Sequence, residues 1–282
     1  MKEFSHVDET LDLNRAHAYR LSIQVSLNGF SFSVLDQVRG KFVLLKHHDL
    51  SDLPSLEKKG DQLDKIMGSE PYLKPAYNKT SAMVASGKST LIPAAYFQEK
   101  NLKKYLEFNH DMDELEEIHY NYLEGLDAYT IFSLPNPLSN SLVRHLGRFN
   151  YYHQGLPFIT WHLDNARSHK KTPALSIYEG FADIGVFSQN KLHFYNSFRW
   201  TAKEDLLYYI LYVYKQLNLD VSGDELYISG SATDQREFQK LVGRYVKKIH
   251  FQKPPEQFTY SYTFSKESAR QFTNLFRLSL CV

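Results

Sequence analysis

Residues 21–46, LSIQVSLNGFSFSVLDQVRGKFVLLK, alternate between apolar and polar positions with a period of two. The alternation breaks at Asn28-Gly29 and again near Arg39-Gly40. Because neighbouring side chains of a strand point to opposite faces, this pattern predicts three antiparallel strands joined by two tight turns. A helical pattern follows, from about residue 51 to 67.

Residues 175–198, LSIYEGFADIGVFSQNKLHFYNSF, repeat this order of elements. The opening letters Leu-Ser-Ile recur, and turns are expected at Gly180 and at Gln189-Asn190. A helix is predicted over 202–217, with Thr201 as its N-cap and Glu204 as the capping-box partner. Residues 206–217 are apolar on nearly all sides, which predicts that this helix is buried between a sheet and another layer.

Between these two units the pattern switches repeatedly between strand and helix. We expect a hairpin turning at Ser86-Gly87-Lys88-Ser89 and a polar break at 168–173, where we place a domain boundary, giving domains 1–169 and 170–282. The other elements expected here are helix 94–108, an acidic connector, strand 128–134, a helix from Pro137 to Phe149, and a strand and helix over 150–167. Beyond the second unit we expect strand 225–229, a turn at Gly230-Ser231, helix 233–246 and helix from Lys266 onward. This succession predicts an α/β protein with mixed sheets covered by helices.

The segment Gly87-Lys88-Ser89-Thr90 matches the last four letters of a nucleotide-binding P-loop. A P-loop also needs a glycine five residues before the Gly-Lys pair and a helix directly after it. Ala82 occupies the first position, and Pro93 follows too soon for a helix. The sequence therefore argues against phosphate binding at this segment.

The duplicated order of strands and helices resembles the actin-like ATPase fold of sugar kinases, Hsp70 and actin. The segments LSIQVSLNGFSFSVLD, RWTAKEDLLYYILYVYKQL and LYISGS more closely resemble an uncharacterised bacterial family of unknown function with this fold. The resemblance implies two ribonuclease-H-like domains, each a mixed sheet with an N-terminal three-strand meander, facing each other across a nucleotide cleft. ATP with magnesium is the cofactor that it implies.

In active members of that superfamily the first hairpin of each domain carries an Asp-x-Gly that contacts phosphate. The first hairpin here contains no carboxylate, whereas the second has Glu179-Gly180 and, on the next strand, Asp183. The turn Gly230-Ser231 matches the position of the adenosine turn. The candidate ligand-binding residues of the interdomain cleft are therefore Gln24, Ser26, Asn28, Gly29, Glu179, Gly180, Asp183, Gly230 and Ser231. Asp36, Glu179 and Asp183 are the acids to test first.

Other clusters of polar or aromatic residues have simpler explanations. Residues 109–122, NHDMDELEEIHYNY, fail the calcium-loop template and lack the second Glu-x-x-His that a di-iron site needs, so we expect a solvated acidic connector. His47 and His48 are expected to be surface histidines beside a turn. Residues 258–264, FTYSYTF, place four aromatic rings on one face if extended, which favours an edge strand packed on its own domain over a partner interface.

Composition and charge narrow the classes of partner. The chain has 282 residues and a formal net charge of +1, so no global field attracts nucleic acid or an anionic membrane. Cys281 is the only cysteine, which excludes an intrachain disulfide and fits a reducing compartment. The first twenty residues are too polar for a secretory signal, and the most apolar run, 206–214, is too short to span a bilayer, so we expect a cytoplasmic protein.

These observations favour an actin-like fold whose nucleotide site is degenerate, acting as an interaction or regulatory module with a protein partner. Losing a metal-facing carboxylate should cost phosphoryl transfer several powers of ten in rate, because that reaction depends on positioned charge. The alternative is an active ATP-dependent kinase or ATPase with an atypical phosphate site. A ribonuclease-H-type nuclease is disfavoured, because the strands lack the clustered carboxylates of two-metal cleavage.

Overall fold

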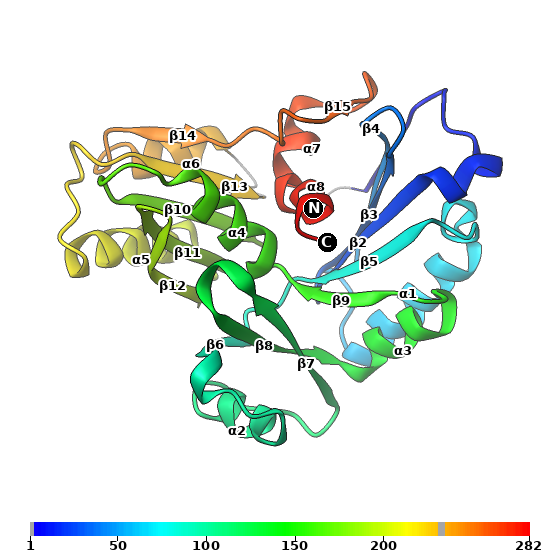
Figure 1. Cartoon of the computed structure of the whole chain (residues 1–282), viewed down its shortest axis with the longest axis horizontal. Coiled ribbons are helices and arrows are strands. Elements are labelled where there is room, and N and C mark those ends of the chain that lie inside the picture. Colours follow the sequence, from blue (N-terminus) through cyan, green and yellow to red (C-terminus); the bar gives the residue numbers. More distant parts are fainter. Residues whose placement is uncertain (1–2, 231–234) are drawn as a thin grey trace.

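Two mixed sheets of the same topology form the frame of the molecule (Figure 1). The computed structural model describes residues 3–230 and 235–282. The first sheet has the order β4-β3-β2-β5-β9, and the second has the order β12-β11-β10-β13-β14. In each, the first three strands along the chain pair antiparallel and the other two join in parallel. The duplicated ribonuclease-H-like fold, with a three-strand meander opening each copy, is thereby confirmed.

The strands of the two sheets have the following bounds. The first sheet contains β2 (Tyr19–Val25), β3 (Gly29–Asp36), β4 (Lys41–Asp49), β5 (Lys79–Val84) and β9 (Asn150–His153), with β1 (Phe4–Val7) and β15 (Thr259–Tyr260) both paired to β4. The second sheet contains β10 (Thr172–Tyr178), β11 (Phe181–Ser188), β12 (Lys191–Arg199), β13 (Leu226–Gly230) and β14 (Ile249–Phe251). Gln189 and Asn190, between β11 and β12, both have positive φ (52° and 54°), as the tight hairpin turn predicted there requires.

Helices cover both faces of each sheet. Helices α1 (Leu56–Ser69) and α3 (Asn136–His145) pack on one face of the first sheet, and α5 (Lys203–Gln216) and α6 (Gln235–Val242) pack on the outer face of the second. Helices α4 (Gly155–Asn165) and α8 (Thr273–Cys281), the latter preceded by α7 (Lys266–Gln271), contact each other between the two sheets. Figure 1 shows α8 in this central position. No helix within the described ranges is long and apolar enough to cross a membrane.

The C-terminal segment returns to the first sheet. Phe272, Leu275, Phe276 and Leu278 are buried against a patch of that sheet formed by Leu35, Phe42, Leu45 and Met83. Arg20, on β2, donates hydrogen bonds to the carbonyl oxygens of Ser279 (2.9 Å) and Val282 (2.7 Å), and so fixes the end of α8. The domain limits 1–169 and 170–282 remain a prediction, and part of the second range lies against the first sheet.

A third, small antiparallel sheet was not expected from the sequence. It contains β6 (Ser89–Pro93), β8 (Ala128–Pro135) and β7 (Glu116–Leu123) in the order β6-β8-β7, with α2 (Leu102–Glu107) beside it. It projects at the bottom of Figure 1. The hairpin predicted around Gly87 is wrong, because β5 pairs with β2 and β9 while β6 pairs with β8. The hydrophobic pattern of a sequence shows that two strands follow each other along the chain, but it does not show which sheet each strand joins.

Two expectations within this region need correction. The helix expected over 94–108 is reduced to α2 and two short 3-10 turns, Ala94–Tyr96 and Glu99–Asn101. The acidic connector expected over 109–122 ends earlier, because Glu116 begins β7. The strand opens with the adjacent acids Glu116 and Glu117, so the high charge of the segment masked its strand pattern.

Three expectations elsewhere also fail. The capping acid of α5 is Asp205, whose carboxylate accepts hydrogen bonds from the backbone of Thr201 (2.9 Å) and of Ala202 (2.9 Å). This helix exposes Tyr208 and Tyr212 and is therefore not buried on all sides. His47 is buried and its Nδ1 lies 2.8 Å from the hydroxyl of Ser31.

The aromatic segment 258–264 is not one strand. Only Thr259–Tyr260 pairs with β4, because the chain turns soon afterwards. Phe258, Tyr260 and Phe264 pack on the first sheet, whereas Tyr262 is exposed. The segment is thus packed on its own chain, as expected, but with three rings inward instead of four.

Candidate functional site

The first hairpin, β2-β3, and the second hairpin, β10-β11, face each other across a cleft. Each hairpin opens its sheet, so the repeated topology brings the two turns to equivalent places on either side. Between them lies a pocket of about 340 Å³. Its lining includes Ser26, Leu27 and Asn28 of the first turn, Glu179, Gly180 and Phe181 of the second, Ser86, Gly87 and Lys88 after β5, and Arg199 at the end of β12.

The tips of the two hairpins touch. The side-chain amide of Asn28 donates a long hydrogen bond to the backbone carbonyl of Glu179 (3.4 Å). Lys59, on α1, supports the first turn by donating to the carbonyl of Leu27 (2.7 Å) and to the side-chain oxygen of Asn28 (3.2 Å). The first turn is therefore held against the second by a network of neutral groups and one lysine.

Phe181 forms one wall of the cleft, with Tyr178 stacked on it outside the pocket lining. The rings of Tyr178 and Phe181 stack with centroids 4.8 Å apart and planes at 8°, and both rings are buried with Ala85. Phe181 also packs over Gly87, where an added Cβ would come within 3.4 Å of it. Burial raises the pKa of Tyr178, so its hydroxyl stays neutral. This wall is apolar and carries no charge.

The lysine of the segment Gly87-Lys88-Ser89-Thr90 is already paired. Its amine lies 2.6 Å from a carboxylate oxygen of Glu116 and 3.5 Å from one of Asp113. Ser89 and Thr90 belong to β6, which pairs with β8, so no helix N-terminus faces the cleft from this segment. The local geometry differs from that of a phosphate-binding loop in both respects.

Asp183 lies beneath the cleft and is fully buried. Its carboxylate accepts hydrogen bonds from the hydroxyl of Ser197 and from the amide of Gln154 (3.2 Å). Gln154 in turn donates to the carbonyl of Ser86 (2.9 Å) and accepts from its backbone N–H (3.0 Å). Burial raises the pKa of Asp183 to about 7, although the hydrogen bonds from Ser197 and Gln154 favour the charged form. Asp183 is thus a structural acid under the cleft and is not part of the pocket lining.

The structure brings four of the candidate residues to the pocket: Ser26, Asn28, Glu179 and Gly180. Burial raises the pKa of Glu179. Gln24 and Gly29 lie in β2 and β3 outside the lining, and Gly29 is packed so closely that an added Cβ would be 2.7 Å from the ring of His47.

Three further candidates have other surroundings. Gly230 ends β13 with φ of +86°, and an added Cβ would lie 2.1 Å from the carbonyl oxygen of Ile177. Ser231 lies outside the described residues. Asp36 is at the far end of β3 from the first hairpin turn, where its carboxylate lies 2.6 Å from Nε of Arg39. Burial opposes its ionisation, but the hydrogen bonds from Arg39 leave its pKa below the ordinary value.

Sequence reasoning missed the residues that shape this cleft most. Phe181 directly follows the expected Gly180 turn, and an aromatic side chain at a hairpin tip was the one signal that could have been noticed. No sequence signal pointed to Gln154 or Ser86, because their roles depend on contacts between elements far apart in the chain. Within the described ranges, no three His, Cys, Asp or Glu side chains are grouped so that they could hold a metal ion.

Residues 8–249 match the family described as "Protein of unknown function (DUF3822)". The chain belongs to this family. The DUF3822 match covers the two large sheets except β1, most of β14 and the C-terminal return. The comparison with curated proteins found no match.

Several solved structures have a similar fold. A Bacteroides thetaiotaomicron protein with actin-like ATPase fold and unknown function is similar with a TM-score of 0.80 and 24% identity, over 97% of this chain and 100% of that one. The PilM-PilN type IV pilus biogenesis complex is similar with a TM-score of 0.63 and 10% identity, over 93% of this chain and 97% of that one. The ethanolamine utilization protein EutJ from Carboxydothermus hydrogenoformans has a TM-score of 0.54 and 10% identity, over 98% of this chain and 93% of that one. At these identities the similarity establishes the actin-like ATPase fold.

Proposed function

We propose that this protein is an interaction or regulatory module built on an actin-like ATPase fold, without efficient ATP hydrolysis. The observation that carries the proposal is the stack of Tyr178 on Phe181 beside the contact of Asn28 with Glu179. These groups lie at the tips of the two hairpins, which contact the phosphates of the nucleotide in active members of the superfamily.

The physical reason for expecting no efficient ATP hydrolysis is electrostatic. A triphosphate with magnesium brings several charges into the cleft, and each one buried against apolar rings loses hydration without a compensating partner. Phosphoryl transfer also needs cations and metal-holding carboxylates aimed at the phosphates. Lys88 is paired with Glu116, and Asp183 lies beneath the pocket with its pKa raised to about 7. These residues do not fit magnesium-bound ATP.

A protein partner is supported by the outer face of the small sheet. Tyr120 and Tyr122 on β7 are 37% and 46% exposed, and the ring of Tyr129 on β8 stacks on Phe97 with centroids 3.8 Å apart. Exposed aromatic rings gathered on one face are typical of protein interfaces. One of the solved structures with a similar fold belongs to a protein complex, the PilM-PilN type IV pilus biogenesis complex. The net charge of +1 and the single cysteine favour a cytoplasmic protein partner over nucleic acid or membrane.

The first test is thermal unfolding with and without millimolar ATP, ADP and magnesium. A ligand at a hundred times its dissociation constant stabilises the folded state by about 2.7 kcal/mol, which would be readily visible. We expect no shift, and an active actin-like ATPase measured in parallel serves as the positive control. Magnesium-dependent ATP turnover that disappears in Glu179→Gln or Asp183→Asn would refute the proposal and establish the alternative, an active kinase or ATPase.

The partner is tested by affinity purification of the tagged chain from its native host. We expect a protein that is enriched with the wild type and lost in the double variant Tyr120→Ser, Tyr122→Ser. The matched control is Tyr208→Ser, Tyr212→Ser, which removes two exposed tyrosines from α5 and should leave the enrichment unchanged. Equal enrichment with both double variants would contradict a binding role for the small sheet.

A further inference from the structure

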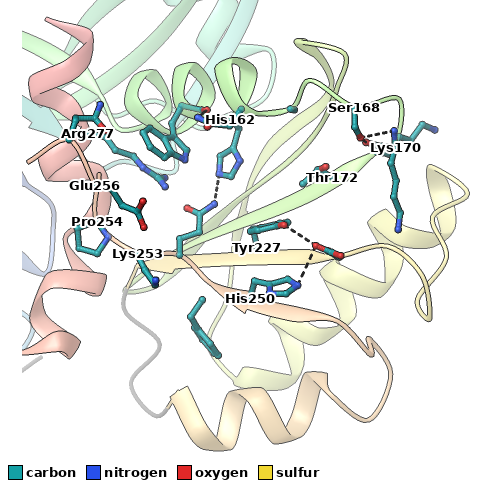
Figure 2. Close-up of a pocket in the computed structure, with 18 residues that line it drawn as sticks. His162, Ser168, Lys170, Thr172, Tyr227, His250, Lys253, Pro254, Glu256 and Arg277 are labelled. Atoms are coloured by element: carbon teal, nitrogen blue, oxygen red, sulfur yellow. Dashed lines mark hydrogen bonds and ion pairs between the residues drawn. The ribbon is translucent and has the colours of Figure 1, made fainter.

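A second pocket, of about 840 Å³, lies on the second sheet between α4, α8 and the loop after β14 (Figure 2). None of its lining residues belongs to the cleft between the hairpins. The volume falls within the range of small-molecule binding sites. Ligand binding in this pocket is therefore independent of whether the cleft between the hairpins binds a nucleotide.

A buried arginine without an acidic partner contributes to this pocket. Arg277, on α8, is 1% exposed, and its guanidinium stacks on the ring of Trp161 with 4.5 Å between its Cζ and the ring centroid. One Nη donates to the side-chain oxygen of Asn274 (3.2 Å), and Nε has no hydrogen-bond partner. No carboxylate among the described residues forms an ion pair with it. Figure 2 shows the side chain directed toward the space between His162 and Glu256.

Such a charge is costly in an empty pocket. Burial of a guanidinium without a counter-ion loses hydration that one neutral hydrogen bond does not replace, and accordingly burial lowers the pKa of Arg277 to about 9. His162 adds no second positive charge, because burial and the nearby Arg277 lower its pKa and keep it neutral. An anion bound beside Arg277 would balance this buried charge.

The rest of the lining favours an anion as well. Four cationic side chains line the pocket, those of Lys170, Lys171, Lys253 and Arg277, together with the two carboxylates of Glu225 and Glu256. Lys170 is paired with Asp224 (3.6 Å) and Lys171 donates to the carbonyl of Leu217 (2.9 Å), so Arg277 and Lys253 are the cations that face an incoming anion. Glu225 is already bound by the hydroxyl of Tyr227 (2.8 Å) and lies 3.3 Å from Nε2 of His250. Only Glu256, which is exposed, remains to oppose an incoming anion.

We propose that this pocket binds a small organic carboxylate whose carboxyl group pairs with Arg277. A planar guanidinium matches the two oxygens of a carboxylate, and one buried positive charge balances one negative charge. A phosphate dianion would leave a buried charge uncompensated, because the lysines stand farther out. Trp161 and Tyr227 supply apolar surface for the body of the ligand.

Trp161 provides a direct readout, because it touches Arg277. Trp161 and Trp200 are the chain's two tryptophans, so a Trp200→Phe background leaves Trp161 as the single fluorophore. In this background we titrate benzoate, phenylacetate and indole-3-acetate, following Trp161 emission for the first two and backbone and side-chain NMR shifts for the third. Ionic strength is held constant with chloride, and inorganic phosphate is titrated separately.

We expect a saturable response to at least one carboxylate, weakened about tenfold in Arg277→Lys, which keeps the charge but loses the planar fork. Two variants of exposed lining residues test the proposal without changing the buried arginine. Lys253→Ala should weaken carboxylate binding, and Glu256→Gln should strengthen it. Lys104→Ala, an exposed lysine on α2, is the matched control and should change nothing.

Three results of the binding experiments would overturn the proposal. The first is the absence of a saturable response to all three carboxylates, and the second is equal affinity in Arg277→Lys. The third is saturation by phosphate alone, which would assign the pocket to a phosphate group. Thermal unfolding of Arg277→Met separates binding from structure: we expect its melting temperature to be equal to or above that of the wild type, because a methionine removes the buried charge. A marked fall would instead make Arg277 a structural residue and contradict the proposal.

Discussion

The side-chain amide of Gln154 lies 3.2 Å from the buried carboxylate of Asp183. Gln154 is the N-cap residue of α4 and follows β9 of the first sheet, whereas Asp183 lies on β11 of the second. The same amide group exchanges two hydrogen bonds with the backbone of Ser86, at the end of β5. One glutamine therefore joins the two sheets directly under the cleft. The stability of this joint depends on the protonation of Asp183.

Asp183→Asn should change how stability depends on pH. The pKa of Asp183 is about 7 in the folded state against 3.8 for an ordinary aspartate, so folding favours the protonated acid. That stabilisation is present below the unfolded pKa and is lost as the pH rises through the folded pKa. Relative to the neutral Asn variant, the wild type should lose up to about 4 kcal/mol between pH 4 and pH 8. Urea unfolding across this range measures the difference.

Glu114→Gln is the control for this comparison, because Glu114 is exposed. Its stability difference from the wild type should stay nearly constant over the same pH range. A pH-independent difference for Asp183→Asn would mean that Asp183 titrates as an ordinary surface acid.

Gly230→Ala should destabilise the second sheet strongly. The residue has φ of +86°, and the added Cβ would lie 2.1 Å from the carbonyl oxygen of Ile177, so the backbone of β10 or β13 must move. We expect a loss of about 3 kcal/mol or more in the free energy of unfolding. Gly40→Ala is the matched control, since Gly40 also has positive φ (+59°) but open space around it. It should cost only about 1 kcal/mol.

Phe181→Ala should remove one wall of the cleft. Phe181 is buried in a stack with Tyr178 and also covers Gly87, so truncation leaves a cavity and should cost about 3 kcal/mol. It should not create ATP binding, because widening the cleft adds no charge to hold phosphate. Urea unfolding and nucleotide thermal shifts check both outcomes. Phe108→Ala, at an 86% exposed position, should change stability by less than about 0.5 kcal/mol.

Arg20→Met should loosen the end of α8. Two hydrogen bonds from the guanidinium to the carbonyls of Ser279 and Val282 disappear, and the cation near the helix C-terminus is lost. We expect faster amide exchange in the last turn of α8 and a stability loss of about 1 to 2 kcal/mol. Arg15→Met removes an exposed arginine with the same change of side chain and should leave exchange in α8 unaltered.

The strand meanders were predictable because they are local. Alternating apolar positions and turn residues such as Asn28-Gly29 and Gln189-Asn190 specify each hairpin within some 25 residues, and the two copies share the same pattern. The duplicated fold followed from them. The segment around Gly87 shows the limit of this reasoning, since β5 and β6 are adjacent in the chain but join different sheets.

Local pattern also determined which residues stand at the hairpin tips, and Ser26, Asn28, Glu179 and Gly180 line the pocket between the hairpins. That they bind a ligand stays a prediction. Tertiary structure decided everything that depends on contacts across the chain. Burial and hydrogen bonding make Asp183 a structural acid, the closure of Phe181 over Gly87 makes the cleft wall apolar, and the return of α8 carries Arg277 to Trp161. The physical reason is that solvation and charge pairing depend on neighbours in space, which the order of residues alone does not specify.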